Sequence, residues 1–172
     1  IKDRGHTHNW RGYHASLGAD KNISWEITAA EQTGSNYWQD TVPTSSVFSI
    51  GSSSAVNLSG RNYVGYVFTD IVGFSKMGSF VGNGNANGKF VYTGFKPAFI
   101  MMKSTAANEN WTIYDNKRAS FNPSTVRLHP NLNNAESSST DLDLLSNGFK
   151  VRSDNDVRQC CLLYTSPSPR DK

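Results

Sequence analysis

The feature that most limits the fold of this 172-residue chain is an internal repeat. A pattern of Asn-Trp followed by Tyr occurs twice, at a constant offset of 101 residues. Its members are Asn9, Trp10, Tyr13, Asn110, Trp111 and Tyr114. Further matches keep the same order, at an offset of 105 for residues 30–31 and of 97 for residues 48–51. The offsets change within polar loops, where insertions cost little. Self-similarity of this kind indicates a duplicated structural unit.

We expect both repeat units to be incomplete. Residues 78–103 open the second unit, and no counterpart precedes Ile1. Residues 60–68 close the first unit, and the second unit stops before their equivalent. We therefore expect residues 1–75 to be the C-terminal part of a first repeat and residues 76–159 the N-terminal part of a second.

The composition favours short strands joined by many turns. Aromatic residues make up 12% of the chain, and Gly, Ser, Asn and Thr lie between them. Aromatic and β-branched residues pack well on pleated surfaces, whereas Gly and Asn suit turns. Several short strands at this spacing predict an all-β fold of two incomplete antiparallel sandwich-like repeats with little helix.

Individual strands can be placed from local patterns. Residues 98–103 predict a buried strand entered at Pro97, which has no amide to donate. Residues 111–114 alternate as a two-faced strand does, and residues 63–68 predict a buried strand. Asn147-Gly148 predicts a hairpin turn. Residues 137–143 predict a short helical turn capped by Ser or Thr.

The end of the chain resembles a translated transposase adapter from sequencing libraries, with eleven consecutive matches from Cys161 to Asp171. We therefore expect residues 160–172 to be non-native, and segments of library origin are excluded from fold reasoning. The Cys160-Cys161 pair then indicates nothing about redox compartment, metal binding or catalysis.

Turn and strand motifs carry a family resemblance. The chain resembles uncharacterised tandem β-repeat modules of phage tail and virion structural proteins. The motifs are structural, and the signature residues are Asn9, Trp10, Tyr13, Gly94, Phe95, Pro97, Asn110, Trp111, Tyr114, Asn147 and Gly148. The resemblance implies lectin-like sandwich units with an adhesive or architectural role in the virion, by analogy of fold.

Catalytic chemistry has little support in the sequence. The candidate carboxylates lie in polar, turn-rich stretches and are Asp70, Asp115, Glu136, Asp141 and Asp143. We expect Asp115 to cap the turn that follows its strand. No Gly-x-Ser-x-Gly elbow or phosphate-binding loop occurs. We therefore expect a protein that is not an enzyme and needs no cofactor.

His6 and His8 form a weak candidate metal site. Alternate residues of a strand share a face, so both rings could reach one metal ion. A solvent-exposed loop is the competing interpretation, and the equivalent stretch of the second unit has Ala106 and Asn108.

A glycan-binding platform is the second hypothesis. Sugar sites use exposed aromatic rings flanked by hydrogen-bonding side chains, and Asn36, Tyr37, Trp38 and Asp40 have this chemistry. Packing of Tyr37 and Trp38 in the core is the alternative. Trp10, Trp25 and Trp111 are expected in the core, because buried aromatics remove the most surface from water.

Three functions follow. The first is a non-enzymatic phage tail or virion module, contacting neighbouring repeats or other virion subunits and contributing to host-surface adhesion. The alternatives are a carbohydrate-binding module that recognises host-surface glycans, and a fragment of a glycan-degrading tail enzyme. The net charge of +3 is too small to imply nucleic-acid binding, and no segment is apolar enough to insert into a membrane. We expect location in the virion, or otherwise outside the cell.

Overall fold

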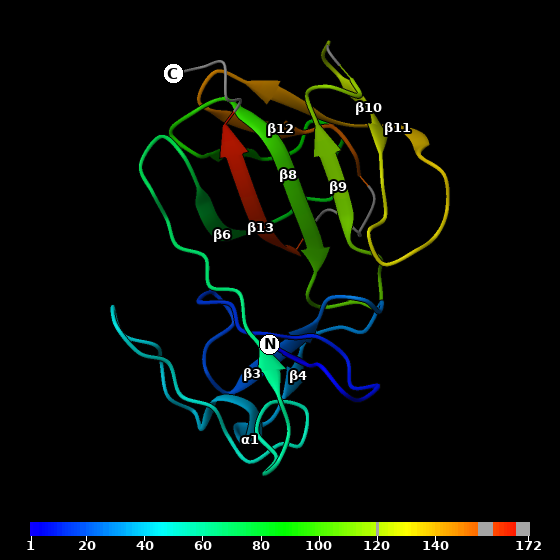
Figure 1. Cartoon of the computed structure of the whole chain (residues 1–172). Helices are drawn as coiled ribbons and strands as arrows, with labels where there is room; N and C mark the ends of the chain where they lie inside the picture. Colours follow the sequence, from blue (N-terminus) through cyan, green and yellow to red (C-terminus); the bar gives the residue numbers. More distant parts are fainter. Residues whose placement is uncertain (120, 155–159, 168–172) are drawn as a thin grey trace. The chain divides into compact units, whose positions relative to one another are not determined.

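The computed structural model describes residues 1–119 and 121–154, and the backbone of residues 160–167 (Figure 1). The regular secondary structure of the described chain is almost entirely antiparallel β-sheet, which confirms the expected all-β, sandwich-like fold class. It divides into two compact units. The first comprises Ile1–Phe68 with Ala106–Asn108, and the second comprises Thr69–Thr105 with the described residues of Glu109–Lys172. The division thus falls at Phe68, ahead of residue 75.

The first unit contains β1 (Lys2–Asp3), β2 (Arg11–Gly12), β3 (Lys21–Ser24), β4 (Gln32–Thr33), α1 (Ser35–Trp38) and β5 (Tyr63–Val64). The second unit contains β6 (Lys76–Val81), β7 (Phe90–Tyr92), β8 (Pro97–Ser104), β9 (Thr112–Asp115), β10 (Ser124–Arg127), β11 (Ser137–Leu145), β12 (Gly148–Val151) and β13 (Cys160–Pro167).

The second unit is a sandwich of two four-stranded antiparallel sheets. One sheet has the order β10-β11-β12-β7 and the other β6-β13-β8-β9. Buried side chains from both sheets form one core of Ile100, Met102, Tyr114, Leu142, Leu144, Phe149 and Val151. The rings of Phe80 and Phe149 meet edge to face, with centroids 5.9 Å apart, and so join β6 to β12. Full burial of each such side chain contributes roughly 1.5–3 kcal/mol.

Three local patterns place strands as expected. Pro97 is buried at the first position of β8, where no ladder amide is needed. Burial alternates along β9, with Tyr114 fully buried. Leu145 pairs with Gly148 across the turn that joins β11 to β12, which confirms the predicted hairpin. Asp115 accepts the amides of the following turn, as its position after a strand predicts.

The helical turn expected over residues 137–143 is wrong, because these residues lie in β11. The strand is paired on both edges, with β10 and with β12. Leu142 and Leu144 enter the core. Backbone pairing with β10 and β12 and burial of the two leucines therefore outweigh the tendency of serine to cap a helical turn. Both effects depend on residues outside this segment.

The buried strand expected over residues 63–68 is also corrected. Strand β5 covers Tyr63–Val64 alone, and both residues are half-buried. The exposed fractions of Tyr66, Val67 and Phe68 are 67%, 77% and 54%. The one described strand that pairs with β5 is β1, which is also two residues long.

The first unit packs around Trp38. A three-stranded sheet has the order β2-β3-β4, and the single turn of α1 directs Trp38 into a core with Ala19 and Val56. The indole Nε1 of Trp38 donates to the carbonyl oxygen of Lys21 in β3 at 2.9 Å. The ring of Tyr13 meets the Trp38 ring edge-on at 6.1 Å.

The backbone ladders of the two units match residue by residue. Adding 101 to residues 1–12 and 105 to residues 21–33 converts four backbone pairs of the first unit into pairs of the second. The matched pairs, first unit before second, are Ile1–Arg11 and Met102–Thr112, Gly12–Ile23 and Ile113–Leu128, Lys21–Thr33 and Val126–Ser138, and Asn22–Gln32 and Arg127–Ser137. The two units thus share one hydrogen-bonding frame at the offsets found in the sequence.

The Asn-Trp motifs occupy equivalent places in that frame. The amide of Trp111 donates to Oδ1 of Asn131 at 3.0 Å, and the amide of Trp10 donates to Oε1 of Glu26 at 2.7 Å. Asn131 and Glu26 are themselves related by the offset of 105. Trp111 is buried, whereas Trp10 is half-buried and stacks on Tyr66, with ring centroids 5.8 Å apart.

Backbone geometry explains why glycine occupies two of the signature positions, Gly94 and Gly148. Gly94 has a φ of +84°, a conformation that side chains disfavour, and its amide donates to the carbonyl oxygen of Asn147 at 3.2 Å. A Cβ at Gly148 would lie 2.1 Å from the carbonyl oxygen of Val91. Glycine at position 148 is therefore required for the close pairing of β12 with β7.

Strand β13 lies in the stretch that we expected to be non-native. Its backbone pairs antiparallel with β6 on one edge and β8 on the other, at the centre of the four-stranded sheet. The structure thus assigns this stretch a place inside a sheet, although the sequence placed it outside fold reasoning.

Candidate functional site

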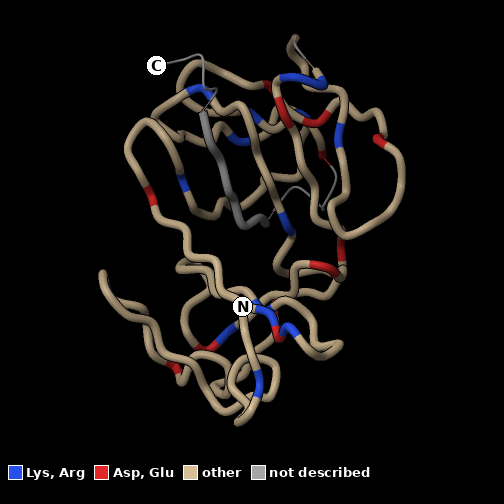
Figure 2. Tube along the Cα trace, viewed as in Figure 1, with Lys and Arg blue, Asp and Glu red and all other residues tan. Residues whose placement is uncertain are grey.

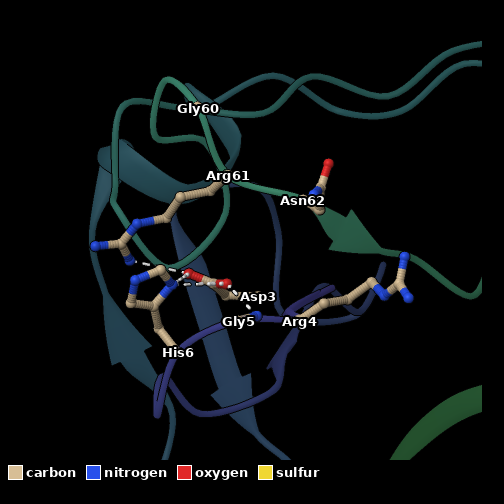
Figure 3. A pocket seen from close by; sticks show the side chains of 7 residues that line it. All are labelled: Asp3, Arg4, Gly5, His6, Gly60, Arg61 and Asn62. Atoms are coloured by element: carbon tan, nitrogen blue, oxygen red, sulfur yellow. Dashed lines mark hydrogen bonds and ion pairs between the residues drawn. The ribbon is translucent and has the colours of Figure 1, made fainter.

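The first unit carries a hollow of about 330 Å³ (Figure 3). Its lining residues are Asp3, Arg4, Gly5, His6, Gly60, Arg61 and Asn62. They come from β1 with the loop that follows it, and from the three residues ahead of β5. The pairing of β1 with β5, continued by a 2.9 Å bond from the Arg4 amide to the Asn62 carbonyl oxygen, brings the two segments together.

Side chains at the start of the loop hold its shape. Oδ1 of Asp3 accepts the amide of Gly5 at 2.9 Å, which closes a local turn. Lys2 Nζ donates to the carbonyl oxygens of His6 at 3.0 Å and of His8 at 2.5 Å. The backbone carrying His6 is therefore positioned by β1 itself.

Asp3 is the buried centre of the hollow, with 1% of its surface exposed. Nη1 of Arg61 lies 2.9 Å from Oδ2 of Asp3, and Nδ1 of His6 lies 3.2 Å from the same oxygen. Burial raises the pKa of Asp3, but hydrogen bonds with Gly5, Arg61 and His6 oppose it and bring the pKa down to about 2. The carboxylate is therefore ionised throughout the physiological range.

The arrangement leaves a cationic rim around one buried anion. Figure 3 shows Arg61 and His6 turned toward Asp3, while Arg4 extends away from them. Asp3 offsets the charge of Arg61, so Arg4 supplies one excess positive charge among the lining residues. Elsewhere basic and acidic residues are interspersed along the described trace (Figure 2). The lining of the hollow contains one carboxylate, where glycoside hydrolysis needs two.

The two histidines differ in their surroundings. His6 is exposed, and its Nδ1 faces Asp3, whereas His8 is half-buried. Within the described residues, no group of three or more His, Cys, Asp or Glu side chains is arranged to hold a metal ion. The fold therefore brings no third ligand of these types to His6 and His8 within the described residues.

The proposed glycan platform is divided between core and surface. Trp38 is 4% exposed and belongs to the core, so it presents no open ring face to a sugar. Tyr37 is half-buried, and the Arg11 guanidinium lies over its ring, 5.1 Å from the centroid. Asn36 and Asp40 are exposed. The sequence alone could not distinguish a core role from a platform role for Trp38. The carbonyl oxygen that accepts its indole N–H belongs to Lys21 in β3, which is distant in sequence.

The candidate carboxylates do not converge on one site. Asp141 is buried and accepts the hydroxyl of Tyr114 at 2.5 Å, while Asp143 faces Nε of Arg152 at 2.6 Å. Both lie in β11 and not in the polar turn that we expected. Of the remaining three, Asp70 is paired with Lys76. Asp115 and Glu136 share Arg118, at 2.8 Å and 3.9 Å.

Sequence reasoning missed Asp3 and Arg61 altogether. They are 58 residues apart, and neither lies in a recognisable motif. The one usable signal was the polar run around Arg61 immediately ahead of an apolar strand. Without the pairing of β1 with β5, nothing in the sequence joins it to Asp3.

Comparison with known proteins gives one result. A family model described as a domain of unknown function, DUF7483, matches residues 1–161. No curated protein and no solved structure matches the chain. In the described part of the chain, no helix has the length and apolar character needed to span a bilayer.

Proposed function

The chain belongs to the DUF7483 family of domains of unknown function, and we propose that it is a non-enzymatic structural module of a phage tail or virion. In this role it would contact neighbouring repeats or other virion subunits and contribute to adhesion at the host surface. The virion setting rests on the resemblance of its turn and strand motifs to such modules.

The duplicated hydrogen-bonding frame carries this proposal. Pairs at the same offsets recur in both units, yet the side chains on that frame differ. Buried Asp3 of the hollow corresponds to Ser104, and Arg11 corresponds to Thr112. A protein built by repeating a scaffold while changing its polar side chains is organised for architecture, because a catalytic constellation requires particular groups.

Labelling of particles tests the proposal. Antibodies raised against the chain should bind tails or capsids of phage particles that encode it, as seen by immunogold electron microscopy. Particles from a phage lacking the gene provide the control. Labelling confined to host cells, with bare particles, would refute the virion role.

The hollow around Asp3 favours a second candidate function, recognition of acidic glycans. Arg4 and Asn62 stand at its rim beside the buried pair of Asp3 and Arg61. A sugar carboxylate or sulfate would gain charge-assisted hydrogen bonds there. Asp3 belongs to β1, and the Arg4 amide donates to the Asn62 carbonyl oxygen, so backbone pairing holds the two sides of the hollow together.

Glycan-array binding tests this second candidate. Binding to sulfated or carboxylated glycans should fall with Arg4→Gln, because this removes the excess charge and leaves the Asp3–Arg61 pair intact. Lys89→Gln, on an exposed residue of the second unit, is the matched control. Equal binding by both variants, or binding to neutral glycans alone, would exclude the hollow as the site.

A further inference from the structure

The clearest unfilled position in the described structure is the outer edge of the 63–68 segment. Strand β5 pairs with β1 in a two-stranded sheet. Its equivalent in the second unit is β13, because Lys2–Val64 and Asp3–Tyr63 match Lys103–Leu162 and Ser104–Cys161. Strand β13 is paired on both edges, with β8 and with β6. In the first unit, no described strand occupies the place of β6.

The direction of the backbone identifies the groups at that edge. The Arg4 amide donates to the Asn62 carbonyl oxygen, so residue 62 turns its backbone groups toward β1. Successive residues of an antiparallel strand alternate edges. Tyr63 therefore directs its N–H and C=O groups away from β1, and a strand continued through residue 67 sets those of Gly65 and Val67 on the same edge. The equivalents of these three positions lie opposite Phe80, Gly78 and Lys76 of β6.

The side chains along this edge do not protect it from pairing. Residues 63–68 contain no charged residue and no proline, the usual devices that block addition of a strand. Tyr66 and Val67 are 67% and 77% exposed. An apolar edge of this kind is a template for another strand.

We propose that the outer edge of the 63–68 segment seats a strand of the β6 type, supplied by a further copy of residues 76–81. The expected register sets Phe80, Gly78 and Lys76 of such a strand opposite Tyr63, Gly65 and Val67. We infer a strand of the β6 type because the two units share one hydrogen-bonding frame. In the second unit, β6 is the strand that pairs with the outer edge of β13, the equivalent of β5. The inference concerns assembly of repeats and stands apart from the virion setting.

A grafted chain tests the proposal. Because Ile1 corresponds to Met102, a second copy of residues 76–101 is placed directly ahead of Ile1. The Ile1 nitrogen, which donates to the Arg11 carbonyl oxygen at 2.7 Å, remains a donor as an amide. The added copy then carries β6, β7 and the start of β8 in their native order.

Amide hydrogen exchange followed by NMR gives the readout. We expect the amides of Tyr63, Gly65 and Val67 to exchange about tenfold more slowly in the grafted chain, the slowing that matches roughly one net hydrogen bond. The amide of Val64, which already faces β1, should change less. This alternation would not follow from a general gain in stability.

A matched graft supplies the control. Gly78→Pro in the added copy removes the amide that would donate to the Gly65 carbonyl oxygen and puts a ring carbon in its place, which keeps the two strands from closing at this pair. Protection at Gly65 should therefore be lost, while the length and nearly all of the sequence are kept. Protection that persists in this control, or falls on the β1-facing amides, would refute the register.

Cross-linking keeps the test decisive if the graft folds poorly. A peptide of residues 75–82 carrying Gly78→Cys is offered to the full chain carrying Gly65→Cys, with Cys160 and Cys161 changed to Ser. We expect a disulfide adduct by intact mass, and a several-fold smaller yield with Val64→Cys, whose backbone faces β1. Disulfide-linked dimers of the chain in place of peptide adducts would mean that a second 63–68 segment occupies the edge. That result, or absence of both adduct and protection, overturns the proposal.

Discussion

Substituting Tyr114 by Phe tests how the second unit holds a buried charge. Tyr114 is fully buried, and its hydroxyl donates to Oδ2 of Asp141 at 2.5 Å. Asp141 is 1% exposed and also accepts Ser139 Oγ at 2.5 Å and Arg127 Nη1 at 3.2 Å. The aromatic ring stays in the core after Tyr114→Phe, so one hydroxyl group is all that is removed.

The expected cost follows from the charge on the acceptor. A hydrogen bond to a charged group contributes about 1.5–3 kcal/mol to stability, and a neutral one about 1 kcal/mol. Asp141 keeps its bonds with Ser139 and Arg127, so its desolvation remains largely compensated. We therefore expect Tyr114→Phe to lower the free energy of unfolding by about 1.5–2 kcal/mol, roughly a 10- to 30-fold change in the equilibrium constant.

Urea unfolding measures this effect when it reports on the second unit alone. Tryptophan fluorescence is unsuitable because both units contain tryptophan, so we would follow the NMR methyl signals of Ile100 and Leu142. Tyr92→Phe is the control, since Tyr92 is 67% exposed and should cost less than about 0.5 kcal/mol.

A double-mutant cycle with Asp141→Asn identifies the interaction responsible. Residues in one hydrogen-bond network couple by about 0.5–3 kcal/mol. If the two substitutions add within about 0.3 kcal/mol, or Tyr114→Phe leaves the unfolding midpoint unchanged, the hydroxyl does not stabilise Asp141 and the reasoning fails.

Three further predictions concern single residues. The pKa of Asp3 is about 2 in the folded chain against 3.8 for the free group, so its contribution to stability is present above pH 3.8 and is lost as pH falls toward 2. In acid titrations monitored by circular dichroism, Asp3→Asn should flatten this loss, and an unchanged profile would contradict it. Gly148→Ala should destabilise the second unit by more than about 2 kcal/mol, because its Cβ meets the Val91 carbonyl oxygen. Gly78→Ala, whose Cβ would have no atom within 4 Å, should cost under about 0.5 kcal/mol in the same urea assay. Trp38→Ala should destabilise the first unit by about 3–5 kcal/mol as a core truncation, and a stable variant that loses only sugar binding would restore the platform interpretation.

The sequence determined those parts of the fold that depend on neighbouring residues. Pro97 marked the start of β8, the alternation at residues 111–114 marked β9, and Asn147-Gly148 marked the turn into β12. The offsets of 101 and 105 also located equivalent backbone pairs, because insertions between repeats fall in loops and leave the ladders in register.

Tertiary structure decided which polar residues are buried and what they bond to. Asp141 lies in a polar stretch, but Tyr114 and Arg127 from other strands allow it inside the sandwich. Asp3 is paired with Arg61 from 58 residues away. A buried charge is tolerated only where a partner is supplied, and that partner comes through strand pairing and not through local sequence.

The apolar segments show the same division. Trp38 could have been platform or core, and its hydrogen bond to β3 decided for the core. Residues 63–68 read as a buried strand, yet Tyr66 and Val67 are exposed. Hydrophobicity specifies that a side chain favours burial, whereas the number of strands that flank it determines whether burial is achieved.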